Sequence, residues 1–349
     1  MRSFLGRKFP SWWRAENQPA TYPRMFLDVA VERGADREGI LRRAGIERAR
    51  IDDPAGRLSL LEFFTLHEAI GPSDPTLGFE TGHRLPLTAH GSLGYALMCA
   101  PTARAAIGIL ERYWHLRGRA VIMRPREDGT FLEVLPEVEM PPWLRDQLFA
   151  SMLTSMVRGL TFLVPEAANE TEIWLLGDEP AGFAAFRDRL PRVRFGMAIA
   201  GLRDLGDPTR LDRPLPTANP EGLAHALAMC EHESKLMGGG ADPLLVRVRT
   251  ALRLGTRGYP SPAALAKALH LTPRTFRRRL QEHGTSYQTL LEEARRRDAC
   301  RLLEKPALPV QRIAALLGYD DPANFTRAFR TWTGVPPSTW RRSARLDSK

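Results

Sequence analysis

Apolar positions recur every three to four residues through much of the first 120 residues of the chain. This spacing places apolar side chains on one face of a helix and therefore predicts amphipathic helices. Most of the runs close at a glycine, as helix C-termini commonly do. The predicted helices have the sequences RMFLDVAVERG (24–34), REGILRRAG (37–45), SLLEFFTLHEAIG (59–71) and TARAAIGILERYWHLRG (102–118).

Shorter apolar runs follow, bounded by glycine, proline and charged residues, and such runs are typical of strands in an antiparallel sheet. A long apolar helix is predicted between them at residues 142–164. Arg158 interrupts its most apolar part, which favours a buried helix over a membrane span. Helices mixed with strands in this order predict an α+β domain. The predicted strands lie in RAVIMRP (119–125), TFLEVLP (130–136), EIWLLG (172–177) and VRFGMAI (193–199).

Four prolines in the segment 205–220 predict an extended connection, which is followed by a helix at 221–237 and by Gly238–Gly240 as a flexible joint. Beyond the joint the pattern is wholly helical. Seven helices are predicted there, at about 242–254, 261–268, 272–282, 286–303, 309–316, 322–332 and 337–343. The chain is therefore divided into a disordered tail (1–22), an α+β domain (23–204), a linker with a connecting helix (205–240) and an all-α domain (241–349).

The all-α domain contains an internal repeat. Its first copy is LAKALHLTPRTFRRRLQEHG (265–284) and its second is IAALLGYDDPANFTRAFRTWTG (313–334). Phe276 matches Phe325, and Leu280 matches Phe329. Each copy reads as a short helix, a turn and a second helix with two apolar residues facing the core. This layout predicts two helix-turn-helix motifs, in which the second helix enters the major groove of DNA.

The outward faces of the two second helices are suited to contact DNA. Arginine reads guanine in the major groove, whereas Thr and Ala contact a thymine methyl group or a phosphate. Arginine-rich helix faces are also common on solvated surfaces, but two copies with matched faces favour binding to DNA. The predicted DNA-binding residues are Arg274, Thr275, Arg277 and Arg278 in the first copy and Ala323, Thr326 and Arg327 in the second.

Charge is segregated along the chain. Residues 241–349 carry 21 Lys and Arg against 9 Asp and Glu, whereas residues 1–240 carry 29 against 31. The helix predicted at 286–303 is about 27 Å long and would hold the two motifs about one turn of DNA apart. We therefore expect one chain to read two successive major grooves. Arg295 on this helix is either a phosphate contact or part of a solvated face.

Residues 313–341 resemble the signature of the AraC/XylS family, with Trp340 in place of the usual Tyr before Arg341. The resemblance implies a seven-helix DNA-binding domain and transcriptional control, often activation through RNA polymerase. Residues 25–235 more loosely resemble the arabinose-binding-type sensory domain of the subgroup with ornithine- or arginine-use regulators and some mycobacterial virulence regulators. These resemblances imply a regulator that binds double-stranded DNA as a homodimer and responds to a small-molecule effector.

An enzyme with a DNA-binding domain is the less favoured alternative. The run HGSLG (90–94) is not a nucleophile elbow, and no nucleotide-binding or zinc-protease motif occurs, so no catalytic residue, cofactor or metal is expected. Cys99, Cys230 and Cys300 are far apart and fit small buried residues of a reducing cytoplasm. A second alternative is an architectural DNA-binding protein that has no effector.

An effector pocket is expected in the α+β domain, although its position does not follow from the sequence. Histidine and aromatic residues are candidates to line it, but the same residue types at helical spacing usually belong to the core. The candidates are His83, His90, Tyr95, Trp114, His115 and Trp174.

Overall fold

The chain forms two compact units, Met1–Gly240 and Ala241–Lys349, in a computed structural model. The expected glycine joint Gly238–Gly240 and most of the helix expected at 242–254 lie outside the described residues. The structure describes residues 11–118, 120–126, 130–136, 140–197, 199–237, 244, 248, 251–252, 254, 258–303, 308–333 and 335–346.

The sequence predicts a disordered tail over residues 1–22, and the structure differs from residue 11 onward. A 3-10 turn, η2 (Ser11–Arg14), leads into strand β1 (Glu16–Pro19), which pairs antiparallel with β2 (Arg57–Ser59). Trp13 is buried against Phe64, with 5.3 Å between the ring centroids. One buried aromatic side chain and a short strand pairing thus tie this segment to the first unit.

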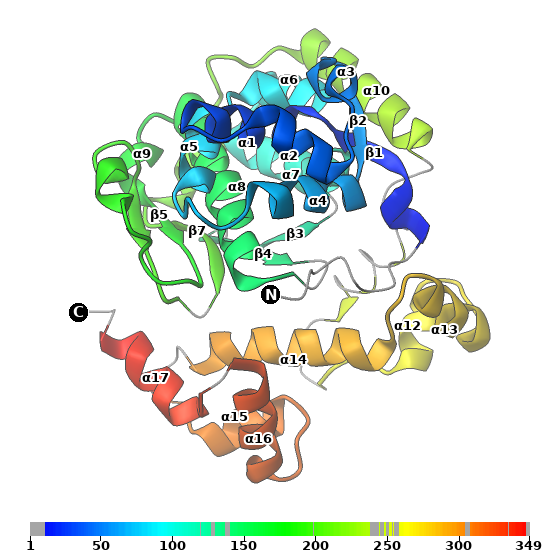
Figure 1. Cartoon of the computed structure of the whole chain (residues 1–349). Coiled ribbons are helices and arrows are strands. Elements are labelled where there is room, and N and C mark those ends of the chain that lie inside the picture. The colour runs from blue at the N-terminus through cyan, green and yellow to red at the C-terminus, as the bar shows by residue number, and fades with distance from the viewer. Residues whose placement is uncertain are drawn as a thin grey trace. The chain divides into compact units, whose positions relative to one another are not determined.

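Helices make up most of the next 100 residues of the first unit (Figure 1). Helix α4 begins at a capping box, in which Ser59 and Glu62 each bind the backbone of the other. The predicted helices correspond to α1, α2, α4 and α7, whereas α3, α5 and α6, none longer than eight residues, were not predicted. The elements are α1 (Thr21–Glu32), α2 (Arg37–Ala44), α3 (Arg48–Asp52), α4 (Leu60–Ile70), α5 (Leu77–Arg84), η3 (Leu87–His90), α6 (Gly91–Met98), α7 (Ala103–Tyr113) and η4 (Trp114–Leu116).

A five-stranded sheet has the order β3-β4-β7-β5-β6. The expected antiparallel sheet is wrong in one respect, because β5 and β6 pair in parallel and the sheet is therefore mixed. Strand β7 begins where the run predicted at 193–199 ends, and it pairs antiparallel with both β4 and β5. The strands are β3 (Val121–Pro125), β4 (Phe131–Pro136), β5 (Thr171–Trp174), β6 (Arg192–Arg194) and β7 (Ala200–Asp204).

Helix α8 (Pro142–Leu163) lies in the middle of the first unit and contacts β5, β7 and α5 (Figure 1). Its crossing with α5 is unusually close because two glycines face it. A Cβ atom on Gly78 would lie 2.2 Å from the carbonyl oxygen of Gln147, and one on Gly82 would lie 2.2 Å from that of Ser151. Any larger residue at either glycine would therefore force the two helices apart.

The segment 205–240, expected to be a linker with a connecting helix, belongs to the first unit. Leu211, Leu215 and Cys230 from this segment are buried in one core cluster with side chains of α6 and α7. Helix α10 packs against α6. The elements in this part of the unit are α9 (Ala167–Glu170), η5 (Phe183–Phe186), η6 (Pro208–Asp212) and α10 (Pro220–Leu236).

The described part of the second unit is helical (Figure 1). Helices α12 and α13 each begin with a proline in the first turn and a hydroxyl cap, in which Ser261 and Thr272 accept a backbone N–H. The longest helix, α14, connects the two halves of the repeat. The helices are α12 (Pro262–Ala268), α13 (Pro273–Glu282), α14 (Tyr287–Leu303), α15 (Val310–Leu316), α16 (Pro322–Thr333) and α17 (Pro337–Leu346).

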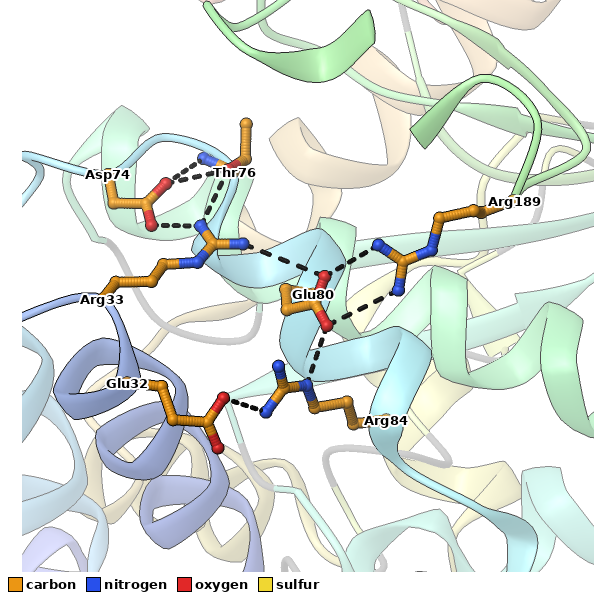
Figure 2. Close-up of polar contacts among 7 residues, drawn as sticks. All are labelled: Glu32, Arg33, Asp74, Thr76, Glu80, Arg84 and Arg189. Atoms are coloured by element: carbon orange, nitrogen blue, oxygen red, sulfur yellow. Dashed lines mark hydrogen bonds and ion pairs between the residues drawn. The ribbon is translucent and has the colours of Figure 1, made fainter. Parts of the chain in front are cut away.

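Glu80 on α5 lies at the centre of a charged network that joins α1, α5 and the loop after η5 (Figure 2). Its carboxylate accepts hydrogen bonds from Arg84 Nε at 2.7 Å and Arg189 Nη1 at 3.0 Å. Arg33 lies 3.9 Å from it and also binds Asp74. Although burial opposes ionisation, hydrogen bonds from Arg189 and Arg84 keep the pKa of Glu80 below its ordinary value. The network therefore stabilises the packing of three separate segments.

We predict that Glu80→Gln lowers the free energy of unfolding by roughly 1.5–3 kcal/mol, since hydrogen bonds to a charged group contribute about that much. Urea unfolding of the full chain near neutral pH measures this loss. The control Arg187→Gln removes an exposed ion pair with Glu179 and should cost less than about 1 kcal/mol.

The loss should depend on pH. Because the pKa of Glu80 is depressed in the folded state, its contribution is present above the ordinary value of 4.5 and is lost as the pH falls through the folded-state pKa. The parent and the Gln variant should therefore converge in stability under acid conditions. A difference that stays constant down to about pH 3 would contradict the role of this carboxylate.

Candidate functional site

The two copies of the repeat bury matching side chains. Ala266, Phe276 and Leu280 of the first copy are at most 2% exposed, and their counterparts in the second copy are fully buried. These counterparts are Ala314, Phe325 and Phe329. The small alanine in each first helix allows the second helix to pack closely across it. The buried faces therefore orient α13 and α16 in the same way within their own motifs.

The turns between the paired helices are also repeated. In the first copy the N–H of His270 binds the carbonyl of Lys267 and the N–H of Leu271 binds that of Ala266. In the second copy Gly318 and Tyr319 make the same two bonds, each 48 residues further along. Both turns need a left-handed backbone, with a φ of +57° at His270 and +78° at Gly318. The repeat thus extends to the backbone.

The residues predicted to contact DNA lie on the outward faces of α13 and α16. Arg274, Arg277, Arg278, Ala323 and Arg327 are exposed, and the two threonines are half-buried. In the described side chains, Arg278 pairs with Glu282 and Arg327 binds Asn324, each within its own helix. Such exposed pairs contribute little and exchange readily for a phosphate or a base edge.

The two threonine hydroxyls are engaged within their own helices. The Thr275 hydroxyl lies 2.9 Å from that of Thr272, the residue that caps α13. The Thr326 hydroxyl donates to the carbonyl of Pro322 at 3.0 Å. The arginines therefore offer the freest donors on the outward faces of the motifs.

Arg295 on α14 has a structural role that the sequence does not reveal. Its Nε donates to the carbonyl of Leu317 at 2.9 Å, and its guanidinium lies 4.8 Å from the ring centroid of Tyr319. These contacts hold the turn of the second motif against α14. The guanidinium is therefore partly occupied, which argues against the phosphate contact considered from the sequence.

The first unit contains a cavity of about 90 Å³. Its walls come from β1, α1, α4, η3, η4, β3, α8 and the segments between them, and they are mostly apolar. Trp114 forms part of the wall and is fixed by a 2.9 Å hydrogen bond from Nε1 to the carbonyl of Val121. The described polar residues that line the cavity are Gln18, Tyr22, His90, Arg117, Ser151 and Ser155.

A hydrogen-bonded chain of three side chains crosses the cavity wall. The hydroxyl of Tyr22 lies 2.8 Å from His90 Nδ1, and His90 Nε2 lies 3.1 Å from the hydroxyl of Ser155. Burial lowers the pKa of His90 to about 4, and the nearby charge of Arg117 acts in the same direction. Burial also raises the pKa of the Tyr22 hydroxyl. All three side chains are therefore uncharged at neutral pH.

Arg117 connects the cavity to helix α10. Its side chain is 6% exposed, and its Nη2 donates to Glu233 at 2.7 Å and to the Ser92 hydroxyl at 2.9 Å. The Ser92 hydroxyl in turn donates to the other oxygen of Glu233 at 2.6 Å. Arg57 adds a second cation 3.6 Å from Glu233. A residue of α10 is thus bound directly to the only charged side chain among the described residues that line the cavity.

Comparisons with known proteins identify both units. Residues 265–343 match the family model described as a helix-turn-helix domain, and residues 34–215 match the arabinose-binding domain of AraC transcription regulators. The ornithine utilization regulator of Pseudomonas aeruginosa is 32% identical over 345 residues, covering 96% of this chain and 99% of the relative. The chain belongs to the AraC family of transcription regulators.

Another relative is the HTH-type transcriptional regulator VirS of Mycobacterium tuberculosis, which is 35% identical over 327 residues and covers 90% of this chain and 94% of its own. The crystal structure of the transcriptional regulator CdpR from Pseudomonas aeruginosa covers 87% of this chain and 96% of its own, with 23% identity and a TM-score of 0.40. This AraC-family chain is a DNA-binding transcription regulator, and the expected α+β domain followed by an all-α domain with two helix-turn-helix motifs is confirmed.

The cavity of this AraC-family regulator includes two of the six residues proposed from the sequence to line an effector pocket. His90 and Trp114 line it. Tyr95 is 53% exposed, and Trp174 lies in β5 with its Nε1 bound to Glu172. His115 binds Ser234 of α10, and the carbonyl of His83 accepts a hydrogen bond from Arg158.

Tyr22 and Arg117 were not predicted to line the pocket, because nothing in their local sequence separates a buried polar residue from an exposed one. In the described part of this regulator, no group of three or more His, Cys, Asp or Glu is placed to hold a metal ion. Among the same residues, no helix combines the length and the apolar character that a membrane span requires.

We predict that His270→Gly stabilises this regulator by about 0.5–1 kcal/mol, because a side chain in left-handed backbone costs about 1–2 kcal/mol and part of the gain is offset by the extra freedom of glycine in the unfolded chain. His270 is exposed, so little packing is lost. The unfolding midpoint of the full chain measures the change. The reverse change, Gly318→His, should destabilise, and equal stability of all three proteins would contradict the strained turn.

Proposed function

We propose that this regulator inserts α13 and α16 into two successive major grooves and that a small molecule in the cavity of the first unit controls this binding. The observation that carries the DNA-binding part is the pair of matched motifs, each with exposed arginines on its second helix. Helix α14, with 17 residues, is about 26 Å long and separates the motifs by a distance compatible with one turn of DNA. A single chain then reads an asymmetric site.

The effector part of the proposal is supported by the cavity and by its link to α10 through Arg117 and Glu233. One relative is named an ornithine utilization regulator, and ornithine is therefore one candidate effector for this chain. We infer regulation without catalysis, because the matched family models describe a helix-turn-helix domain and the arabinose-binding domain of a transcription regulator. An architectural protein without an effector would bind throughout a genome, whereas the proposed regulator should give a few sharp peaks in a genome-wide binding map.

The cellular setting follows from DNA binding. We infer a cytoplasmic location, where the chromosome is accessible, and activation of transcription through RNA polymerase as the mode of control. We also infer a homodimer. Its support is the exposure of three large apolar side chains on the packed helices α6 and α10, namely Tyr95, Met229 and Leu236.

We predict that Arg278→Ala and Arg327→Ala weaken binding at different parts of one DNA site, because the two residues lie on separate motifs. An arginine that reads guanine should cost about 1–3 kcal/mol when removed and relax the base preference in its own half only. Footprinting and competition with mutated sites, on DNA selected in vitro from random sequence, measure both effects.

Glu282→Gln provides the control, since it frees Arg278 from its intrahelical pair and should leave binding at least as tight. Binding of the parent should weaken steeply with salt as counterions are released from phosphates. Equal losses on every sequence would make the substituted arginine a phosphate contact, and a footprint over one groove would refute the two-groove proposal.

We predict that the full chain sediments as a dimer and that Met229→Asp shifts it toward a monomer, because a charge buried in an apolar interface is costly. Leu205→Asp is the control, since Leu205 is 53% exposed, against 43% for Met229, but lies between β7 and η6 and belongs to neither α6 nor α10. Sedimentation equilibrium distinguishes the two variants. A dimer that resists Met229→Asp, or an entirely monomeric parent, would reject this interface.

A further inference from the structure

The charge of the cavity wall is one-sided. Arg117 is its cation, and none of the described residues that line the cavity is Asp or Glu. The histidine there, His90, is neutral because burial lowers its pKa to about 4. A buried cation in an apolar environment favours an anionic ligand and disfavours a second cation. The described wall therefore has no carboxylate to pair with the ammonium groups of ornithine.

Arg117 also has a donor without an acceptor. Its Nη2 is taken by Ser92 and Glu233, whereas its Nε is buried and has no hydrogen-bond partner in the described structure. A buried donor without a partner is unfavourable, and most such groups in proteins are satisfied. Guanidinium groups bind carboxylates through two parallel N–H bonds, so a carboxylate is the acceptor that suits this edge of Arg117.

The size and the remaining chemistry of the cavity limit the rest of the ligand. A volume of about 90 Å³ accommodates roughly six to nine water-sized groups, taking about 10–15 Å³ for each. Apolar side chains such as Phe26, Phe63 and Leu148 make up most of the wall. A short aliphatic chain or a single ring attached to one carboxylate matches this space.

We propose that the cavity binds a small monocarboxylic acid, whose carboxylate is received by Arg117 in competition with Glu233 and whose apolar part lies among the side chains of α1, α4 and α8. This inference rests on the proposed function of the cavity as the effector site. The acid and Glu233 share the same guanidinium, so binding of the acid weakens the tie between Arg117 and α10. The effector thereby favours a state in which α10 is held less firmly.

The test uses the full chain and a panel of acids with six to nine non-hydrogen atoms, including hexanoate and benzoate, each paired with its primary amide. L-ornithine is included as a cationic probe. Calorimetry and thermal unfolding at neutral pH measure binding. At least one acid should bind and raise the unfolding temperature, whereas its amide and ornithine should not. Failure of every acid, or equal binding of acid and amide, would overturn the proposal.

Two variants should change the affinity for the acid in opposite directions. Arg117→Met keeps an unbranched apolar side chain, removes the guanidinium and should weaken acid binding roughly tenfold or more, as expected for loss of a charge-assisted pair. Glu233→Gln removes the competing carboxylate and should tighten it. Arg104→Gln is the control, because it removes a guanidinium that binds Asp212 and does not line the cavity.

Arg117→Met leaves the charge of Glu233 without its partner and could prevent folding. In that case the double variant Arg117→Met with Glu233→Gln, which has no such charge, takes the place of the single variant in the comparison. A merely structural role of Arg117 would give weaker acid binding in both single variants, and that result would overturn the proposed competition between the acid and Glu233.

DNA binding by the full chain, with and without each bound compound, tests the acid as the ligand separately from the cavity as an effector site. Control of DNA binding by an amide or by ornithine would refute the acid but keep the effector function, whereas acid binding that leaves DNA binding unchanged would refute the effector function.

Discussion

Helices α5 and α8 cross with backbone against backbone, because Gly78 and Gly82 have hydrogen atoms where other residues have a Cβ. This crossing fixes the position of α8, which supplies five of the residues that line the cavity. Ser155 is one of them, and its hydroxyl lies 3.1 Å from His90 only while α8 keeps this position. Packing in the core of the first unit therefore determines the polar chemistry of its cavity.

In the second unit, the side chains that form the core of each motif are separate from the side chains on its outward face. Its two motifs bury equivalent side chains and repeat the same turn bonds, so their second helices are presented alike. Their outward faces differ, with three exposed arginines on α13 and one arginine at the matched positions of α16. Identical presentation with different side chains is what the reading of an asymmetric site requires.

The sequence predicts features that depend on local periodicity and fails where residues far apart must meet. The match of Phe276 with Phe325 defines the repeat because both lie on amphipathic helices. The parallel pairing of β5 with β6 involves strands of three and four residues, too short to show a period. The cavity combines residues from 18 to 156, so no local pattern reveals it. The prolines of segment 205–220 indicate an extended chain but not that Leu211 is buried.

Glu231, Glu233 and Ser234 on α10 form polar contacts with other parts of the first unit, in addition to the apolar packing of α10 against α6. Glu231 binds Arg112 and Tyr113 at an exposed position, where an ion pair contributes little, and Ser234 makes one hydrogen bond with His115. The pair of Arg117 with Glu233 is the most buried of the three and therefore the strongest electrostatically. The buried pair is therefore the contact whose loss would free α10 most.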